Sequence, residues 1–246
     1  MKNKEIAISV NDLHVYYRDM NRFSLKKGIK HKGSGKLYKA VKGVTFEVPK
    51  GEILGICGKN GSGKSTLLRA ISGIFSADKG SVNLHGNTIS LLSIGVGFQK
   101  QLTGYENIYL SGMLLGYTKE QIDAKIKDII EFSELGDFIY RPVRSYSSGM
   151  HSKLAFSITA ILETDIILID EVLSVGDVHF KEKSYNKMKE LISDSNRTVV
   201  IVSHSSKTIT ELCDRVIWLH EGLIRKEGDP EKIMAEYEEF MREESY

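Results

Sequence analysis

The segment GKNGSGKST (58–66) constrains the fold of this chain more than any other stretch of its sequence. It follows the apolar run ILGIC (53–57) and precedes the helical pattern LLRAISGI, so a glycine-rich loop joins a buried strand to a helix. In this context the spacing G-x-x-x-x-G-K-S points successive backbone N–H groups at phosphate oxygens. Lys64 then reaches the outer phosphates, the Ser65 hydroxyl ligates Mg²⁺ and Thr66 binds further phosphate oxygen. The expected nucleotide contacts are Gly58, Lys59, Asn60, Gly61, Ser62, Gly63, Lys64, Ser65 and Thr66.

The other apolar runs predict an α/β fold with a mainly parallel sheet. DIILID (165–170) and TVVIVSH (198–204) are apolar almost throughout, as expected of strands that are buried on both faces. Helical patterns stand between the strands, and this alternation favours parallel pairing. A partly alternating segment (6–17) predicts a further strand, and most of 105–133 has a helical pattern. RVIWLHEGLIRKEG predicts a hairpin that turns at Glu221-Gly222.

Composition indicates an ordinary intracellular protein. The chain has 246 residues and a formal net charge of +2, so the total charge predicts no strong preference for polyanions. Cys57 and Cys213 lie far apart, which argues against a disulfide or a metal site. We find no signal peptide and no run of about 18 apolar residues, so we expect another protein to provide any membrane anchor.

Polar residues follow two of the predicted strands at the sheet edge where open α/β sheets bind ligands. Behind a phosphate loop, Asp170 is expected to bind Mg²⁺, and Glu171 to polarise the water that attacks the γ-phosphate. We interpret His204 as a switch that hydrogen-bonds the γ-phosphate and positions that water with Glu171. The guanine motif N-K-x-D is missing, since NKMK (186–189) lacks its carboxylate, so adenine is favoured.

A second anion site is predicted at SYSSGM (145–150). Ser147 and Gly149 stand at the start of a helical pattern that runs from about 149 to 162. A hydroxyl, a glycine that permits close backbone approach and the partial positive charge of a helix N-terminus together suit an anion. One chain with one nucleotide has no evident need of two such sites.

The phosphate loop, the SSG helix start, the LIDE strand, the S-V-G-D turn (174–177) and the late histidine resemble, in that order, the ATP-binding subunit of an ABC transporter. The resemblance covers essentially the full chain and implies a single ABC ATPase domain (1–246). Such a domain has a RecA-like P-loop NTPase core, an antiparallel β subdomain and an inserted α-helical subdomain, here at about 97–162. The family forms head-to-tail homodimers, in which the signature segment of one copy caps the γ-phosphate of the ATP held by the other. The signature and turn residues that the resemblance adds to the nucleotide contacts are Ser147, Ser148, Gly149, Met150 and Asp177.

Two assignments stay open within the resemblance. Gln99 follows a strand, as the family's Mg²⁺-sensing glutamine does, but the next loop is short and Gln101 is also within reach. Both are candidate catalytic residues, and Gln99 is also a candidate metal ligand. The tyrosine that stacks on adenine is Tyr17, after the first strand, or Tyr38, after the basic insertion 18–37.

The sequence also indicates a subgroup. KLYKAVKGV, SIGVGFQKQLTGYENIYLSGMLLG, EFSELGDFIYRPVRSYSSGM and IDEVLSVGD resemble exporters of lipid-linked polysaccharides, above all the wall teichoic acid exporter ATPases. This implies integral membrane permease subunits as partners, a location at the cytoplasmic face of the cell membrane, indirect contact with the membrane surface and a lipid-linked polymer as the transported substrate. The residues expected either to line the permease docking groove or to pack in the core of the helical subdomain are Tyr105, Ile108, Tyr109, Leu110 and Met113.

The alternative is a soluble ABC ATPase that acts on nucleic acid or ribosomes. DNA-repair members carry a long coiled-coil insertion before the signature segment, and translation members fuse two ATPase domains. Neither feature is present in this sequence, so no nucleic acid partner is expected.

Overall fold

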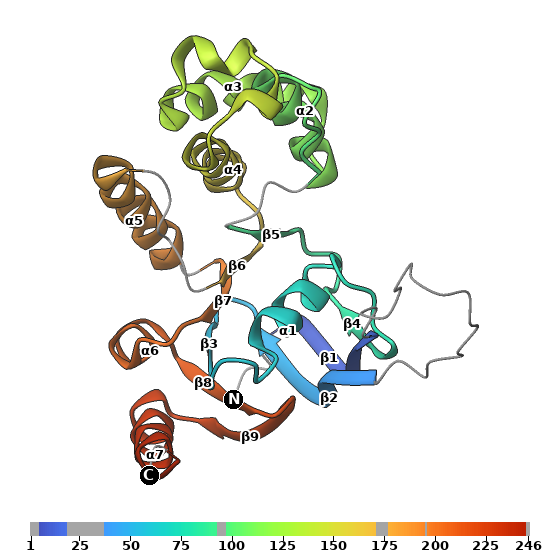
Figure 1. The fold of residues 1–246 in the computed structure, drawn as a ribbon, viewed down its shortest axis with the longest axis vertical. Helices are drawn as coiled ribbons and strands as arrows, with labels where there is room; N and C mark the ends of the chain where they lie inside the picture. Colours follow the sequence, from blue (N-terminus) through green and yellow to red (C-terminus); the bar gives the residue numbers. More distant parts are fainter. Residues whose placement is uncertain (1–4, 19–36, 93–96, 171–176, 195, 245–246) are drawn as a thin grey trace, which may run out of the picture.

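The computed structural model describes residues 5–18, 37–92, 97–170, 177–194 and 196–244. A lobe of helices lies above two sheets (Figure 1). The strands are β1 Ile6–Arg18, β2 Leu37–Pro49, β3 Ile53–Cys57, β4 Lys79–Asn83, β5 Ile89–Leu91, β6 Ile166–Asp170, β7 Thr198–Val202, β8 Arg215–His220 and β9 Leu223–Gly228. The α-helices are α1 Lys64–Ile71, α2 Gly104–Leu114, α3 Lys119–Ser133, α4 Ser148–Ile161, α5 Val178–Ser193, α6 Ser206–Leu212 and α7 Pro230–Glu243. Two short 3₁₀ helices are η1 Gly136–Tyr140 and η2 Val143–Ser145.

A six-stranded sheet in the order β5-β6-β7-β3-β8-β9 carries the phosphate loop. Strands β5 to β8 pair in parallel, and β9 runs antiparallel to β8. The parallel sheet predicted from the sequence is therefore confirmed. Because β6, β7 and β3 are neighbours, their carboxyl ends bring Asp170, His204 and the phosphate loop to one edge of the sheet.

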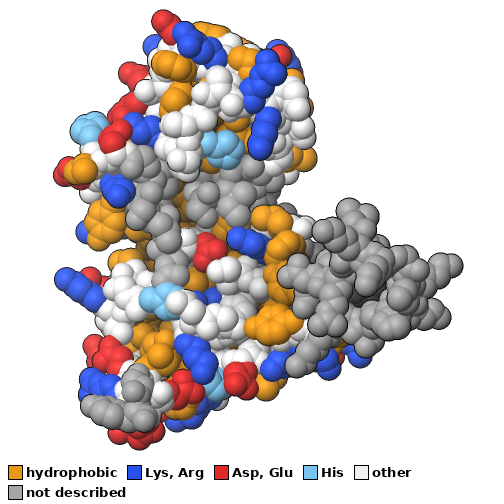
Figure 2. Space-filling model, in the orientation of Figure 1, with side chains coloured by type: hydrophobic (Ala, Val, Ile, Leu, Met, Phe, Trp, Pro, Cys, Tyr) orange, Lys and Arg blue, Asp and Glu red, His pale blue; other side chains and the backbone are white. Residues whose placement is uncertain are grey.

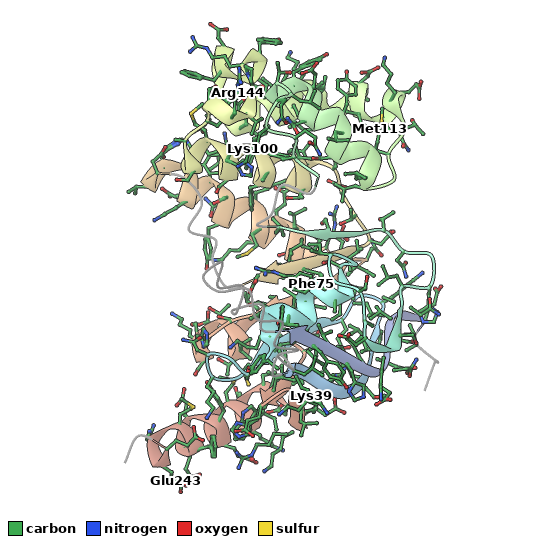
Figure 3. All side chains as sticks on the ribbon, turned by 45° about the vertical axis from the view of Figure 1, so that its right-hand side comes forward. Lys39, Phe75, Lys100, Met113, Arg144 and Glu243 are labelled. Carbon is green, nitrogen blue, oxygen red and sulfur yellow. The ribbon has the colours of Figure 1, made fainter. Side chains whose placement is uncertain are left out.

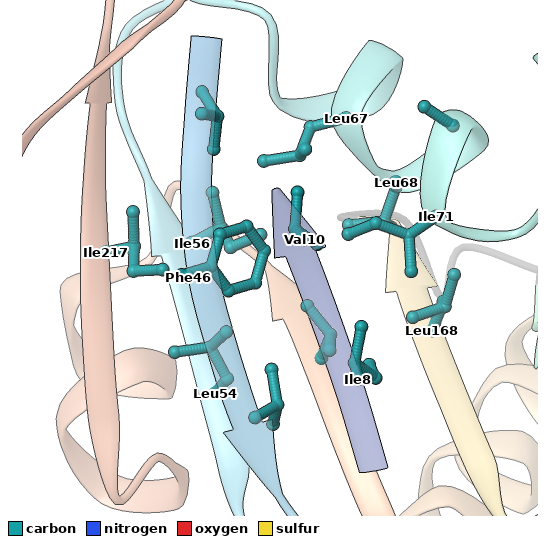
Figure 4. Close-up of a cluster of buried hydrophobic side chains, with 14 of the residues drawn as sticks. Ile8, Val10, Phe46, Leu54, Ile56, Leu67, Leu68, Ile71, Leu168 and Ile217 are labelled. Atoms are coloured by element: carbon teal, nitrogen blue, oxygen red, sulfur yellow. The ribbon is translucent and has the colours of Figure 1, made fainter. Parts of the chain in front are cut away.

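Both faces of this sheet are buried, and alternate strand residues enter different cores. Leu168 and Ile217 pack with Phe46 of β2 and with helix α1 (Figure 4). Ile167 and Ile201 face the other side and pack with residues of α4 and α5. Neither face of a central strand meets water, which explains why these strands are apolar at consecutive positions.

The second sheet is antiparallel, has three strands in the order β2-β1-β4 and lies beside α1. Strand β2 begins at Leu37, well before the VTFEV run (44–48) that indicates it in the sequence. Its early residues alternate poorly because they are mostly exposed, and pairing with β1 extends the strand. The β8–β9 hairpin turns as predicted, with Glu221 (φ 48) and Gly222 (φ 82) both in the left-handed region.

Helices α2, α3 and α4 form a lobe with its own hydrophobic core. Helix α4 also joins this lobe to the sheet, since Leu154 and Ile158 pack in the lobe whereas Phe156 and Ala160 pack against β6 and β7. Helix α6 is absent from the sequence prediction. Ile209 is its buried residue, so its seven residues show no apolar period. No helix in the described ranges is long and apolar enough to span a bilayer.

Candidate nucleotide-binding site

The phosphate loop lies tightly against the strands around it. Gly63 is the N-cap of α1 in a left-handed conformation (φ 104), and a Cβ there would lie 2.4 Å from the carbonyl oxygen of Ala40. A Cβ at Gly58 would lie 2.2 Å from the carbonyl oxygen of Leu219. The Gly222 N–H also donates to the carbonyl oxygen of Ser62 (2.9 Å), so the β8–β9 turn supports the loop from outside.

Lys64 is buried at the start of α1, with 6% of its surface exposed. Its Nζ donates to the carbonyl oxygens of Gly58 (2.6 Å) and Lys59 (3.1 Å). Burial lowers the pKa of Lys64, against the opposing effect of nearby Asp170. An ammonium group that is desolvated and held by neutral carbonyl groups is suited to bind an added anion.

Ser65 and Asp170 meet beside this ammonium group. The Ser65 hydroxyl donates to Oδ1 of Asp170 at 3.2 Å. Oxygen ligands of this kind fit Mg²⁺, which in nucleotide sites takes one or two protein ligands and completes its shell with phosphate and water. Within the described ranges, no group of three or more His, Cys, Asp or Glu side chains is placed to hold a metal ion by itself. Glu171, the predicted general base, lies outside the described residues.

A cavity of about 190 Å³ opens at this edge of the sheet. It is lined by Tyr38, Ala40, Asn60, Gly61, Gly63, Lys64, Ser65, Thr66 and His204. Burial and the positive charge of Lys64 lower the pKa of His204 from its usual 6.5, which favours the neutral ring. Beside the cavity, the Ser62 hydroxyl is buried without a hydrogen-bond partner in the described structure, and Lys59 pairs outward with Glu244 at 3.0 Å.

Tyr17 and Tyr38 both lie at the phosphate loop. They face each other across the β1–β2 ladder, with ring centroids 6.4 Å apart. The Tyr17 hydroxyl contacts Oγ1 of Thr66 at 3.0 Å, whereas the Tyr38 hydroxyl donates to the carbonyl oxygen of Gly61 at 3.1 Å. Of the two, Tyr38 lines the cavity and is the more exposed, at 55% against 38%. Strand pairing thus joins two candidates that the sequence separates.

The signature segment forms a second cavity, of about 320 Å³, on the helical lobe. Ser147 is the N-cap of α4, and its hydroxyl accepts from the Met150 N–H at 3.2 Å. The lining residues are Glu134, Leu135, Phe138, Ser147, Gly149, Met150, Lys153 and Asp177. The predicted contacts Ser147, Gly149, Met150 and Asp177 therefore come together, while Ser148 lies outside this lining.

Charged groups surround this second cavity. Lys153 Nζ binds Oδ2 of Asp177 at 2.7 Å and Oε2 of Glu134 at 3.4 Å, and Lys183 binds the other oxygen of Glu134 at 2.9 Å. The hydrogen bond from Lys153 and that from the Phe180 N–H lower the pKa of Asp177 to about 2. Asp177 also caps α5, so it fixes the start of this helix beside the signature segment.

Tyr146 and Met150, at the two ends of the signature segment, are partly buried against the core of the lobe. The Tyr146 hydroxyl donates to the carbonyl oxygen of Phe138 at 2.8 Å, and burial raises its pKa. Ile108, expected in the docking groove, is fully buried in the same core, whereas Met113 is 52% exposed. The groove prediction is thus wrong for Ile108, because this residue faces the lobe's interior.

The two candidate glutamines share one turn, which is outside the lining of the first cavity. The Leu102 N–H donates to the carbonyl oxygen of Gln99 at 3.1 Å, so Gln99 opens the turn and Gln101 is its third residue. Sequence reasoning missed Asn107, whose side chain binds the backbone of Gln99, and Lys153. An asparagine beside apolar residues in a mostly apolar helical pattern is the signal that could have identified Asn107.

Comparisons with known proteins agree with this geometry. The ABC transporter family profile matches residues 41–174. The chain is 43% identical over 207 residues to an O-antigen export system ATP-binding protein of Klebsiella pneumoniae, covering 84% of each chain. It is 48% identical over 200 residues to a teichoic acids export ATP-binding protein of Levilactobacillus brevis, covering 81% of this chain and 55% of that protein.

An O-antigen export system ATP-binding protein of Myxococcus xanthus is 42% identical over 213 residues, which cover 87% of this chain and 48% of that protein. The chain thus spans about half the length of several curated relatives that it matches. Among solved structures, an ATP-binding subunit of an ABC transporter superposes with a TM-score of 0.70 at 20% identity, over 94% of this chain and 93% of that one. A dimeric ATP-binding cassette bound to ADP and Pi gives a TM-score of 0.67 at 21% identity, over 91% and 98%. The fold is that of ATP-binding cassettes, and the chain belongs to the ABC transporter family.

Proposed function

We propose that this chain is the ATP-hydrolysing, nucleotide-binding subunit of an ABC exporter that moves a lipid-linked cell-surface polymer across the cytoplasmic membrane. It works as a homodimer at the cytoplasmic face, beneath integral membrane permease subunits. The relatives support this, since they are named as ATP-binding proteins of O-antigen and teichoic acid export systems. Wall teichoic acid and O-antigen-like polysaccharide are thus the substrate classes proposed for the whole transporter.

The observation that carries the proposal is the separation of two anion-binding features. The described residues that line the Lys64 cavity and those that line the Ser147 cavity have no member in common. Each cavity offers only part of what a triphosphate needs: an ammonium and loop N–H groups in one, and a capped helix N-terminus in the other. A second copy that faces the first head to tail supplies the missing half of each site.

Several residues of the chain then have distinct roles in ATP hydrolysis. Lys64 neutralises charge on the outer phosphates, and Ser65 with Asp170 would hold Mg²⁺. When bound, Mg²⁺ supplies Lewis-acid stabilisation of the charge on the phosphate oxygens. We assign Glu171 to polarising the attacking water, and the neutral His204 to a hydrogen bond with the γ-phosphate.

The lobe supports contact with a permease. Figure 2 shows hydrophobic side chains among charged ones over its surface. Met113, Leu114 and Tyr140 are exposed at 52%, 57% and 63%. A permease that docks on the lobe would cover these side chains and bury their apolar surface.

Three variants separate the proposed roles. Lys64→Ala is expected to lose nucleotide binding, because it removes the buried ammonium. Glu171→Gln is expected to bind ATP without turnover and to accumulate as a dimer only when ATP is present. Adding Ser147→Ala to Glu171→Gln is expected to lower the dimer fraction while ATP binding by the monomer persists. Equilibrium dialysis measures the binding, and light scattering measures the dimer.

The matched control is Thr118→Ala, which removes the N-cap of α3 on the same lobe. Both cap deletions cost about 1 kcal/mol of helix stability, but only Ser147→Ala should weaken the dimer. Hydrolysis by Glu171→Gln at the parent rate, or full turnover by a monomer, would contradict the proposal. Co-purification with an integral membrane protein supports export, whereas co-purification with RNA or DNA supports a soluble ATPase of nucleic acid.

A further inference from the structure

The turn that carries Gln99 is bound to helix α2 by one buried side chain, Asn107. We propose that Asn107 is a positioning residue for ATP hydrolysis: it fixes the Gln99 turn in the helical lobe, so that Gln99 is presented to the metal and the attacking water. The inference rests on the proposed function, in which Gln99 acts at the nucleotide. It also chooses Gln99 over Gln101 as the acting glutamine.

Asn107 uses its whole amide on this turn. The Gln99 N–H donates to Oδ1 of Asn107 at 2.7 Å. Nδ2 of Asn107 lies 3.1 Å from the Gln99 carbonyl oxygen, 3.3 Å from that of Leu102 and 2.8 Å from that of Thr103. The amide orientation is unambiguous, because its oxygen faces an N–H group and its nitrogen faces three carbonyls. Asn107 is fully buried, so no water can replace these bonds at low cost.

The sequence explains why Asn107 reaches the turn. Thr103 and Glu106 form a reciprocal capping box, which starts α2 directly after the turn. Asn107 stands one helical turn beyond Thr103, and its N–H donates to the Thr103 carbonyl oxygen at 3.0 Å. Its side chain therefore points back over the N-terminus of α2, toward residues 99–102.

The other side of the turn is bound to the segment before the signature. The Arg144 N–H donates to the Lys100 carbonyl oxygen, and the Val143 N–H donates to the Leu102 carbonyl oxygen, both at 2.9 Å. Figure 3 shows Lys100 and Arg144 together in the helical lobe. The rings of Phe98 and His151 also meet at 4.8 Å, which joins the residue before Gln99 to helix α4.

These contacts show which part of the turn Asn107 holds. The main chain of residues 143–144 holds positions 100 and 102. Within the described part of the chain, the hydrogen bonds to the backbone of Gln99 come from Asn107 and from the Leu102 N–H. Loss of the Asn107 amide releases the one residue of the turn that is proposed to act at the nucleotide. It leaves the phosphate loop, which lies outside the helical lobe, unchanged.

Hydrogen exchange in the nucleotide-free protein tests the structural half directly. Asn107→Ala is expected to speed exchange in a peptide covering residues 97–103 by about tenfold or more, with little change in β3 and α1. The matched control is Ile108→Ala at the next position, which is also fully buried but packs in the lobe core. That variant should speed exchange across α2, α3 and α4 rather than in the turn.

Kinetics test the functional half. Asn107→Ala is expected to lower kcat by about tenfold, to raise the Mg²⁺ concentration for half-maximal activity by a similar factor and to leave ATP binding without Mg²⁺ unchanged. Gln99→Ala should do the same, and adding Asn107→Ala to it should cause no further loss. Gln101→Ala should retain the parent's Mg²⁺ dependence.

The outcomes are distinct. Any of three results would overturn the inference. The effects of Asn107→Ala and Gln99→Ala on kcat could multiply in the double variant, Asn107→Ala could keep the parent's Mg²⁺ dependence, or Ile108→Ala could behave in the same way as Asn107→Ala. A parent protein that hydrolyses no ATP would instead refute the proposed function, and the exchange comparison would then decide alone whether Asn107 holds the turn.

Discussion

Truncating Tyr38 should weaken nucleotide binding much more than truncating Tyr17. Both rings lie at the phosphate loop, but Tyr38 lines the cavity beside Lys64. Tyr17 is more covered: its ring meets Phe75 edge-on at 6.0 Å, and its hydroxyl contacts Thr66. The exposed ring of Tyr38 is therefore the one available to stack on a base.

The size of the effect follows from this exposure. Stacking of a base on an aromatic ring is worth about 1–3 kcal/mol when the ring is truncated to alanine. Since 1.4 kcal/mol is about tenfold in Kd, Tyr38→Ala should raise the Kd for ATP by a factor of about 5 to 140. Little folding stability should be lost, because the side chain of Tyr38 is 55% exposed. Tyr38→Phe, which removes only the bond to the Gly61 carbonyl, should bind within about threefold of the parent.

Isothermal titration calorimetry in EDTA isolates this step from turnover, with Lys64→Ala as the non-binding control. Tyr38→Ala should weaken ATP and GTP alike, since every base has a π-face, and Tyr17→Ala should stay within about threefold of the parent. A Tyr38→Ala variant with parent affinity, beside a Tyr17→Ala variant that has lost it, would show that the assignment of the stacking ring is reversed.

Two further predictions concern pH. Asp177, whose pKa is lowered from 3.8 to about 2, contributes stability above pH 3.8 that is lost as pH falls toward 2. Urea unfolding should show this loss in the parent and not in Asp177→Asn. The control Asp128→Asn on α3 should behave like the parent. The lowered pKa of His204 predicts that kcat/KM is maintained at pH 7 and falls on acidification with a midpoint below 6.5; a midpoint above 6.5, or the same acidic limb in His204→Gln, would exclude His204 as its source.

Local sequence patterns predicted what depends on neighbours along the chain. The loop at Lys64, the cap at Ser147 and the turn at Glu221 and Gly222 each need a few consecutive residues, and all three form as expected. The proximity of Tyr17 and Tyr38 could not be read in this way. It depends on β1–β2 pairing across the insertion 18–37, and no residue type near either tyrosine specifies the register.

The roles of Asn107 and Lys153 were missed for a related reason. A buried amide and a largely covered ammonium are costly until their partners are known. Those partners are backbone groups of the preceding turn for Asn107, and for Lys153 the carboxylates of Glu134 and Asp177, which cap α3 and α5. Periodicity marks such positions as interior or exterior, but it does not say what they bind. In this chain a polar residue within a mostly apolar helical pattern is the signal that could have pointed to Asn107.

Helix α4 connects the second cavity to the sheet that carries the first. The N-terminus of α4 presents Ser147 to the second cavity, while Phe156 and Ala160 of the same helix are buried against β6 and β7. A phosphate bound at Ser147 would therefore contact one end of α4, while the other end of α4 is packed against β6, the strand that ends in Asp170. Because close-packed side chains transmit displacement instead of absorbing it, each nucleotide in the proposed dimer acts on both lobes at once. In that dimer, loss of the γ-phosphate would remove the contact proposed for Ser147 of the facing subunit.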